Sequence, residues 1–191
     1  MKEKNRNPWF WVPTVYIAEG VPYMIAMTVS VVLYKNLGLS NKEIAFYTGW
    51  LYLPWVIKPL WSPFVDLFRT KRFWVVLMQL AIGASFAGVA LTLPATDFVR
   101  YTLAMFWIMA FSSATHDIAA DGFYMLGLST PEQAAFVGVR TVFYRVATIA
   151  SKGGLVILAG ALQKSGYPVA SAWSITFLVA AAVFLALCIY H

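Results

Sequence analysis

The sequence is poor in charged residues and has almost no cysteine. Only 12% of its 191 residues are charged, against roughly 25% in soluble domains, and 61% are hydrophobic. This composition excludes an ordinary soluble domain. The single cysteine, Cys188, excludes a disulfide within the chain. The chain also lacks the Gly-x-Ser-x-Gly, His-Glu-x-x-His and phosphate-loop motifs of common enzymes, so we expect no enzyme and no bound metal or cofactor.

Six apolar segments of membrane-spanning length divide almost the whole chain. They cover residues 8–34, 44–67, 73–93, 101–128, 134–162 and 169–190. The connections are short, so consecutive helices should be antiparallel neighbours. We therefore expect an all-α membrane protein: one bundle of six helices in a lipid bilayer.

Helix-start signals mark the second and fifth of these segments. Ser40 and Glu43 have the spacing of a capping box, and Thr130 offers a cap with a proline at the first helical position. Helices two and five should begin close to these residues.

Lysine and arginine are more frequent on one side of the expected bundle. Six lie on the side of the N-terminus and four on the opposite side. The six are Lys2, Lys4, Arg6, Arg69, Lys71 and Arg72, and the four are Lys35, Lys42, Arg100 and Lys164. Because basic residues favour the cytoplasmic side, we expect a cytoplasmic N-terminus. This bias, with the internal basic residues, explains much of the net charge of +6 without a nucleic-acid partner.

A cluster of ionisable residues interrupts the fourth apolar segment: His116, Asp117 and Asp121. Such residues are costly in a bilayer unless they are paired or hydrated, so they usually mark a path for a substrate, an ion or a proton. On a helix, Asp117 and Asp121 share a face and His116 lies about 100° from Asp117. The cluster therefore predicts one polar stripe.

Other ionisable residues lie deep in the first and second segments. Glu19 is about 17 Å into the first segment, near the membrane midplane, and is followed by Gly20 and Pro22, which loosen the helix. Lys58 lies in the second segment, at a depth from which it would reach the membrane surface only with difficulty. A kink with Glu19 tied to a neighbouring donor is the simpler interpretation, and a site role is the other.

The fifth segment carries three basic residues. Arg145 and Lys152 share one polar face, where they either pair with Asp117 or Asp121 or contact the substrate. Arg140 lies about 140° from Arg145 and its simplest interpretation is a side chain that extends to the membrane surface. Acids and bases on four helices indicate a shared hydrated interior. Such a cavity suits a small anionic or zwitterionic solute, and a buried carboxylate could carry a proton.

Two strings resemble those of a known family. Residues 113–122, Ser-Ala-Thr-His-Asp-Ile-Ala-Ala-Asp-Gly, resemble the Thr-Gln-Asp-Ile-x-x-Asp segment in helix four of AmpG-type muropeptide permeases and the related acetyl-CoA transporters of the major facilitator superfamily. Residues 58–66, Lys-Pro-Leu-Trp-Ser-Pro-Phe-Val-Asp, resemble their Lys-x-Leu-Trp-Ser-Pro-x-x-Asp run. His116 replaces the usual glutamine, which either adds a titratable group or preserves a hydrogen bond.

The resemblance implies a fold, a mechanism and a location. The superfamily has twelve helices in two halves, so this chain is similar to the N-terminal half, built as two inverted three-helix repeats, and needs the other half or a second copy. Transport would use alternating access, with Glu19, His116, Asp117, Asp121, Arg145, Lys152 and Lys58 on the path of substrate and protons. Asp66 with Arg69, Lys71 and Arg72 would form a cytoplasmic gate. Muropeptides are the first expected solute, and the bacterial inner membrane is the expected location.

Two other functions remain open at this stage. Asp117 and Asp121 also resemble half of the metal-diphosphate site of intramembrane prenyltransferases, but no second aspartate-rich helix occurs. A channel or a sensor without transport activity is the other alternative, and it would show ion current or signalling without solute accumulation.

Overall fold

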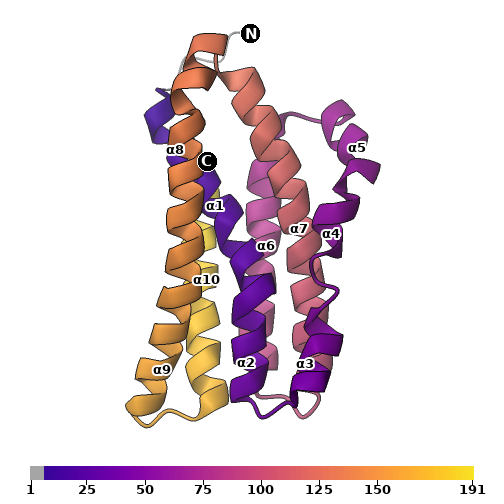
Figure 1. The fold of residues 1–191 in the computed structure, drawn as a ribbon, viewed down its shortest axis with the longest axis vertical. Helices are drawn as coiled ribbons and strands as arrows, with labels where there is room; N and C mark the ends of the chain where they lie inside the picture. The colour runs from indigo at the N-terminus through magenta and orange to yellow at the C-terminus, as the bar shows by residue number, and fades with distance from the viewer. Residues whose placement is uncertain (1–6) are drawn as a thin grey trace.

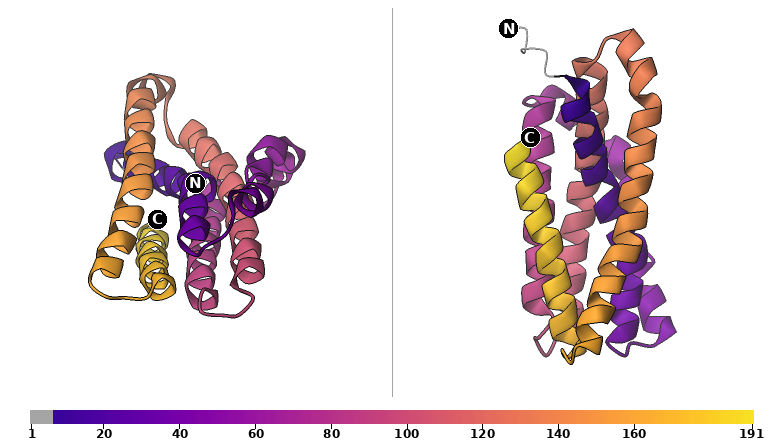
Figure 2. Two further views of the ribbon diagram at one scale, coloured as in Figure 1. Left: turned by 60° about the horizontal axis from the view of Figure 1, so that its bottom comes forward. Right: turned by 90° about the vertical axis from the view of Figure 1, so that its left-hand side faces the viewer.

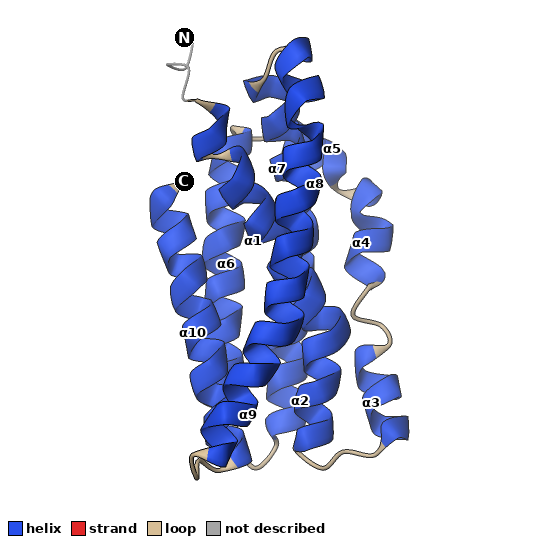
Figure 3. Cartoon of the chain, turned by 60° about the vertical axis from the view of Figure 1, so that its left-hand side comes forward, coloured by secondary structure: helices blue, strands red, loops and turns tan. Residues whose placement is uncertain are grey.

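The computed structural model describes residues 7–191, and these form helices joined by short loops, with no strand among them (Figures 1 and 3). The all-helical prediction is confirmed. Lys2, Lys4 and Arg6, on which part of the expected orientation rests, lie outside the described residues. Successive loops lie at opposite ends of the bundle, so neighbouring helical segments run antiparallel (Figure 1).

The first segment is one long helix with a local distortion near its middle. It runs through η1 (Pro8–Phe10), α1 (Val12–Met24), the π-helix η2 (Ile25–Val29) and α2 (Ser30–Asn36). Pro22 lies inside α1 and cannot donate a backbone hydrogen bond, which explains why the regular pattern changes one turn later. Glu19 therefore lies in the turn that precedes the distortion.

The second segment is not the continuous helix that we expected over 44–67. It is divided into short pieces: α3 (Asn41–Thr48), α4 (Leu53–Ile57), the 3-10 helix η3 (Lys58–Leu60) and α5 (Ser62–Leu67). Pro54, Pro59 and Pro63 each lie in the first two positions of one piece, where a missing N–H is tolerated. The apolar composition suggested a single helix, but the prolines set its breaks.

The remaining segments form long helices. They are α6 (Lys71–Thr92), α7 (Phe98–Gly127), α8 (Thr130–Ala150), the π-helix η4 (Ser151–Leu155), α9 (Val156–Lys164) and α10 (Val169–Tyr190). α8 begins four residues before the predicted start at 134. Its cap is Ser129, whose N–H donates to the Glu132 carboxylate over 2.8 Å, so the cap lies one residue before the predicted Thr130. The predicted capping box of Ser40 and Glu43 is confirmed.

Four of the described helical stretches are long and apolar enough to cross a membrane: Pro8–Asn36, Lys71–Thr92, Thr130–Lys164 and Val169–Tyr190. α7 has sufficient length, at 30 residues, but its polar residues make it less apolar than these four. The second segment lacks the length because it is broken. The chain is thus a multi-pass membrane protein, and the second and fourth of the six expected spans are the two that these four stretches do not include.

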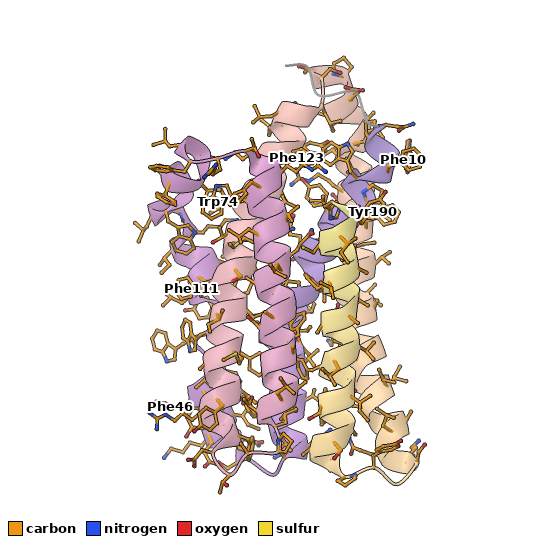
Figure 4. The ribbon with its side chains drawn as sticks, turned by 180° about the vertical axis from the view of Figure 1, so that it is seen from behind. Phe10, Phe46, Trp74, Phe111, Phe123 and Tyr190 are labelled. Atoms are coloured by element: carbon orange, nitrogen blue, oxygen red, sulfur yellow. The ribbon has the colours of Figure 1, made fainter. Side chains whose placement is uncertain are left out.

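Two clusters of buried apolar side chains hold the helices together. The larger joins α6, α7 and α10 through Phe86, Phe106, Phe177 and Phe184. The smaller includes Trp11, Tyr16, Val75, Tyr124 and Phe136 and lies at the end of the bundle that contains the start of α1. Figure 4 shows aromatic side chains gathered at this end, among them Phe10, Phe123 and Tyr190.

α1 and α8 pack closely because of a glycine. A Cβ atom on Gly20 would lie 2.8 Å from the Tyr144 carbonyl oxygen and 3.1 Å from the Ala147 Cβ, so no larger residue fits without separating the helices. α8 and the short helices α3–α5 lie on opposite flanks of the bundle, with α1 between them (Figures 1 and 2). This arrangement directs α1, α7 and α8 toward one another at the depth of Glu19.

Candidate functional site

The polar stripe of α7 has the geometry that its spacing predicts. Asp117 and Asp121 form contacts on one side of the helix, with η3, α1 and α8, while His116 contacts α6. One side of α7 therefore carries both carboxylates, and the imidazole lies apart from them.

Asp117 forms an ion pair with Lys58. The break between α4 and α5 places Lys58 in the short helix η3, opposite α7. The indole Nε1 of Trp61 donates to Thr115 Oγ1 over 3.1 Å and fixes the same break against α7. A residue that would be hard to place in lipid is thus neutralised by a carboxylate of the neighbouring helix.

Asp121 joins α1 and α8. It accepts a hydrogen bond from the Tyr16 hydroxyl over 3.0 Å and lies 3.3 Å from a guanidinium nitrogen of Arg140. The guanidinium carbon of Arg140 lies 4.8 Å from the centre of the Tyr16 ring and 5.2 Å from that of Tyr124. Arg140 is therefore held by two aromatic faces and one carboxylate.

Glu19 is the carboxylate of this cluster without a cation of its own. Its Oε2 atom is buried and has no hydrogen-bond partner among the described residues. Glu19 lies within electrostatic range of Asp117, Asp121 and Arg140. It also lines a cavity of about 190 Å³, together with Tyr16, Arg140, Thr141 and Tyr144. The cluster thus brings three carboxylates and two cations together beside a hollow.

His116 lies in a separate polar chain in which His116 itself and Gln79 are fully buried. Its Nε2 atom is 3.2 Å from Gln79 Nε2, the Gln79 Oε1 atom is 3.1 Å from His191 Nδ1, and His191 Nε2 is 2.8 Å from Thr14 Oγ1. The structure therefore places the predicted His116 in contact with α6 and outside the lining of the cavity. Of the two roles that the sequence left open for His116, a titratable group or a preserved hydrogen bond, this contact with Gln79 corresponds to the hydrogen bond.

Arg145 and Lys152 are exposed on the outer face of α8 and η4. No ion pair within the described part of the chain includes either residue. The expected alternative, in which they pair with Asp117 or Asp121, is wrong, because Lys58 and Arg140 occupy those carboxylates. The reason is rotation around the helix: Arg140 is on the side of α8 that faces α1, and Arg145 is not.

The predicted gate residues divide into two groups. Lys71 forms an ion pair with Asp66 and donates to the Val65 carbonyl over 3.2 Å, which joins α5 to α6. The aliphatic part of Lys71 also covers Gly122 of α7, where a Cβ atom would lie 2.7 Å from Lys71 Cε. Arg69 instead lies over the Phe73 ring, and Arg72 donates to the His191 carbonyl over 2.7 Å.

Sequence reasoning gave too little weight to Arg140, Tyr16 and Tyr144. A signal was available, because Tyr16 precedes Glu19 by three residues and Tyr144 follows Arg140 by four, so each pair shares one helix face. A search for donors on the same face as each buried charge would have found them. No group of three His, Cys, Asp or Glu residues within the described chain is arranged to hold a metal ion.

Comparison with known proteins agrees with the resemblance that the two strings carry, residues 58–66 on η3 and α5 and residues 113–122 on α7. The model of the BT1 family matches residues 19–189, almost the entire chain. The chain belongs to the BT1 family. This membership, with the relatives below, confirms the resemblance to AmpG-type permeases.

Three curated relatives of this BT1 family chain show the same likeness over only part of their lengths. The anhydromuropeptide permease of Escherichia coli K12 is 30% identical over 62% of this chain and 25% of its own length. An uncharacterized protein of Schizosaccharomyces pombe is 28% identical over 77% of this chain and 31% of its own. An uncharacterized protein of Haemophilus influenzae is 30% identical over 87% of this chain and 38% of its own.

The BT1 family chain therefore spans about a quarter to two fifths of the length of the curated relatives that it matches. No solved structure matches it.

Proposed function

We propose that this chain is half of a transporter that moves a small anionic or zwitterionic solute across a membrane together with protons. The observation that carries this proposal is the charged cluster of Glu19, Lys58, Asp117, Asp121 and Arg140 in a membrane bundle, of which Glu19 and Arg140 line a cavity. A bilayer protein keeps such groups where a polar solute or a proton must pass. The Escherichia coli relative is a permease, which supports the same class.

Glu19 is the group that we assign to the proton. Asp117 and Asp121 each have a cation, Lys58 and Arg140, whereas Glu19 has none and its Oε2 atom is buried without a partner in the described chain. Glu19 and the adjacent Asp117 have one cation, Lys58, for two carboxylates, and such a pair is more stable when one of its members is protonated. Loss of that proton on the other side of the membrane would couple transport to the proton gradient.

A second half supplies the other wall of the path in this proposal. The face of α8 and η4 with Arg145 and Lys152 is exposed, and charged side chains do not face lipid. The greater length of the relatives supports a second six-helix half, and a second copy of the chain is the alternative. Each half would consist of two inverted three-helix repeats and would rock about the cavity. Arg145 and Lys152 then contact the solute from this half.

The pair of Asp66 and Lys71 forms the cytoplasmic gate. It joins α5 to α6 and rests on Gly122 of α7, so any movement of α7 relative to α6 must disturb it. Arg69 and Arg72 support the gate as cytoplasmic charges, with the N-terminus on the same side. We place the protein in the bacterial inner membrane, with an anhydromuropeptide as the first candidate solute.

Uptake into proteoliposomes tests this proposal. The chain is reconstituted alone and together with a second half, and accumulation of a labelled anhydromuropeptide is measured under an imposed pH gradient. We expect accumulation by the two-half protein only, and its loss when the gradient is collapsed. Correctly inserted protein that accumulates neither this solute nor any of a panel of other organic anions would contradict the proposed transport.

A further inference from the structure

We propose that Arg140 binds the anionic group of the solute, and that Asp121 occupies Arg140 as a replaceable counter-ion while the cavity is empty. This inference rests on the proposed transport function and assigns its substrate contact to a residue that the sequence alone placed at the membrane surface. The chemical class of ligand is a carboxylate at the end of a larger molecule.

Arg140 has the orientation and the free donors that such a contact needs. The rings of Tyr16 and Tyr124, at 4.8 Å and 5.2 Å from its guanidinium carbon, hold it in position. A guanidinium has five N–H donors, and one of its terminal nitrogens makes the contact with Asp121, at 3.3 Å. Arg140 also lines the cavity, so donors remain for an incoming anion. A planar carboxylate can accept two of them at once.

Asp121 is bound loosely enough to be replaced. The exposed fraction of its side chain is 46%, against 14% for Asp117, and the one hydrogen bond that it accepts within the described part of the chain comes from the Tyr16 hydroxyl. Ion pairs between exposed groups contribute little stability, so a solute carboxylate competes with Asp121 on nearly equal terms. Asp117, which is more buried and paired with Lys58, is not exchanged in this way.

The rest of the cavity limits what enters with the carboxylate. Thr141 and the two tyrosines, Tyr16 and Tyr144, offer hydroxyl groups, while Glu19 would repel a second negative charge unless it is protonated. A cavity of about 190 Å³ has room for the acidic end of a solute and not for a whole sugar-peptide. Entry of one carboxylate therefore favours a proton on Glu19, which links solute binding to proton binding.

Binding of two matched probes tests the inference. The first probe is an anhydromuropeptide, and the second is the same molecule with its carboxylates converted to primary amides. Affinity is measured by calorimetry for the chain in lipid nanodiscs, alone and with the second half. Arg140→Ala should weaken binding of the carboxylate probe by about tenfold or more and leave the amide probe unchanged. Arg100→Ala removes an arginine at the far end of α7 and should change neither.

A second variant should change the affinity in the opposite direction, which a misfolded protein would not do. Asp121→Asn removes the competitor of the solute, so the carboxylate probe should bind several-fold more tightly, whereas a purely structural role would weaken both probes. Equal affinity of wild type and Arg140→Ala for the carboxylate probe would overturn this inference and leave the proposed transport intact. If the wild type, alone and with the second half, binds neither the carboxylate probe nor any of the panel of organic anions, both this inference and the proposed transport are overturned.

Discussion

Among the carboxylates of the cluster, Glu19 is the one that no cation of the described chain neutralises. Lys58 neutralises Asp117, Arg140 neutralises Asp121, and the Oε2 atom of Glu19 is buried without a partner in the described chain. The groups that face it are Asp117 and Asp121 from α7, Arg140 and Tyr144 from α8, and Tyr16 from its own helix. Glu19 can thus bind and release the proton, while the two ion pairs keep the other charges neutralised.

Replacement of Glu19 by glutamine should separate proton coupling from solute exchange. Glutamine keeps the shape of the side chain but carries no titratable proton, so Glu19→Gln should abolish accumulation driven by a pH gradient and retain solute exchange between the two sides. The measurement is uptake and counterflow in proteoliposomes of the two-half protein. Asp97→Asn, which neutralises an acid outside the cluster, is the control. Gradient-driven accumulation by Glu19→Gln at the wild-type level would remove Glu19 from the proton path.

Lys58 should be important for stability because its loss leaves the Asp117 carboxylate without a cation. Lys58→Met places Asp117 next to Glu19 without a cation, and we expect it to lower the free energy of unfolding by about 1 to 3 kcal/mol, between the values for exposed and buried pairs. The double variant Lys58→Met with Asp117→Asn should recover part of this loss. Thermal unfolding in detergent measures both. A double variant less stable than Lys58→Met would mean that the two residues act separately.

At this scale the sequence predicts which residue types are unusual but not which of them meet. Glu19, Lys58, Asp117 and Asp121 stand out because a bilayer makes a charge costly. The partner of Asp121 depends on the rotation of α8 around its axis, which packing against α1 determines. Arg140 and Arg145 are equally costly in lipid, so the cost of burial cannot distinguish between them.

Among the helices, the contact between α1 and α8 depends on one position. Gly20→Ala would place a Cβ atom 2.8 Å from the Tyr144 carbonyl oxygen, and the two helices must separate to relieve the contact. We expect a loss of about 1 to 3 kcal/mol of stability and weaker solute binding, since Glu19 and Tyr144 lie on the separated faces. Thermal unfolding and probe affinity measure these effects.

Gly138 provides the matched control for this substitution. It lies on α8, and a Cβ atom there would contact nothing within 4 Å. Gly138→Ala should therefore leave stability unchanged or raise it slightly, because alanine favours a helix. Equal behaviour of the two alanine variants would contradict the importance of close packing at Gly20.

The start of α3 should respond to acid. The pKa of the Glu43 carboxyl is lowered from its ordinary value of 4.5 because it accepts hydrogen bonds from the Ser40 hydroxyl and backbone N–H. A lowered pKa in the folded state means that the cap contributes fully above pH 4.5 and is lost as the pH falls through the lowered value. Amide hydrogen exchange in the first turn of α3 should therefore rise, relative to the intrinsic rate, below this pH.

Glu43→Gln is the control for the acid response. Glutamine keeps a capping contact but does not titrate, so the extra exchange at low pH should disappear. The same rise in Glu43→Gln would assign it to another group.

At the element scale, caps and spans were predictable wherever one local rule acted alone. The box of Ser40 and Glu43 and the bounds of α10 are confirmed because capping chemistry and apolar length determine them. The second segment differs because its composition is apolar while its prolines prevent a continuous helix. The prediction followed the apolar composition, whereas the structure follows the prolines, which cannot donate a backbone hydrogen bond.

For the whole molecule, the exposed face of α8 provides a test of the proposed second half. Ile149, which is 73% exposed, and Val183 on α10, which is 48% exposed, are both accessible in this chain. Spin labels at Ile149→Cys and Val183→Cys, each in a Cys188→Ser background, report contact with dissolved oxygen in the lipid. Addition of the second half should reduce this contact at Ile149 and leave it unchanged at Val183. A label at Ile149 that stays lipid-exposed in the two-half protein would contradict this placement.

The sequence says least about how the parts of the whole transporter fit together. The family and the all-helical fold followed from two strings and the apolar composition, and both are confirmed. The repeat arrangement, the gate and the second half remain predictions. They depend on contacts between surfaces, and a surface such as that of α8 carries apolar residues whether it meets lipid or protein.

The broken second segment also affects how the protein is made. Its pieces, at most eight residues each, are too short to cross a bilayer, and their interrupted backbone needs polar partners that lipid does not offer. Two polar side chains of the segment, those of Trp61 and Lys58, likewise find their partners on α7, in Thr115 and Asp117, which are synthesised 54 and 59 residues later. The segment should therefore remain at the insertion machinery until α7 emerges, so the order of membrane insertion differs from the order of synthesis.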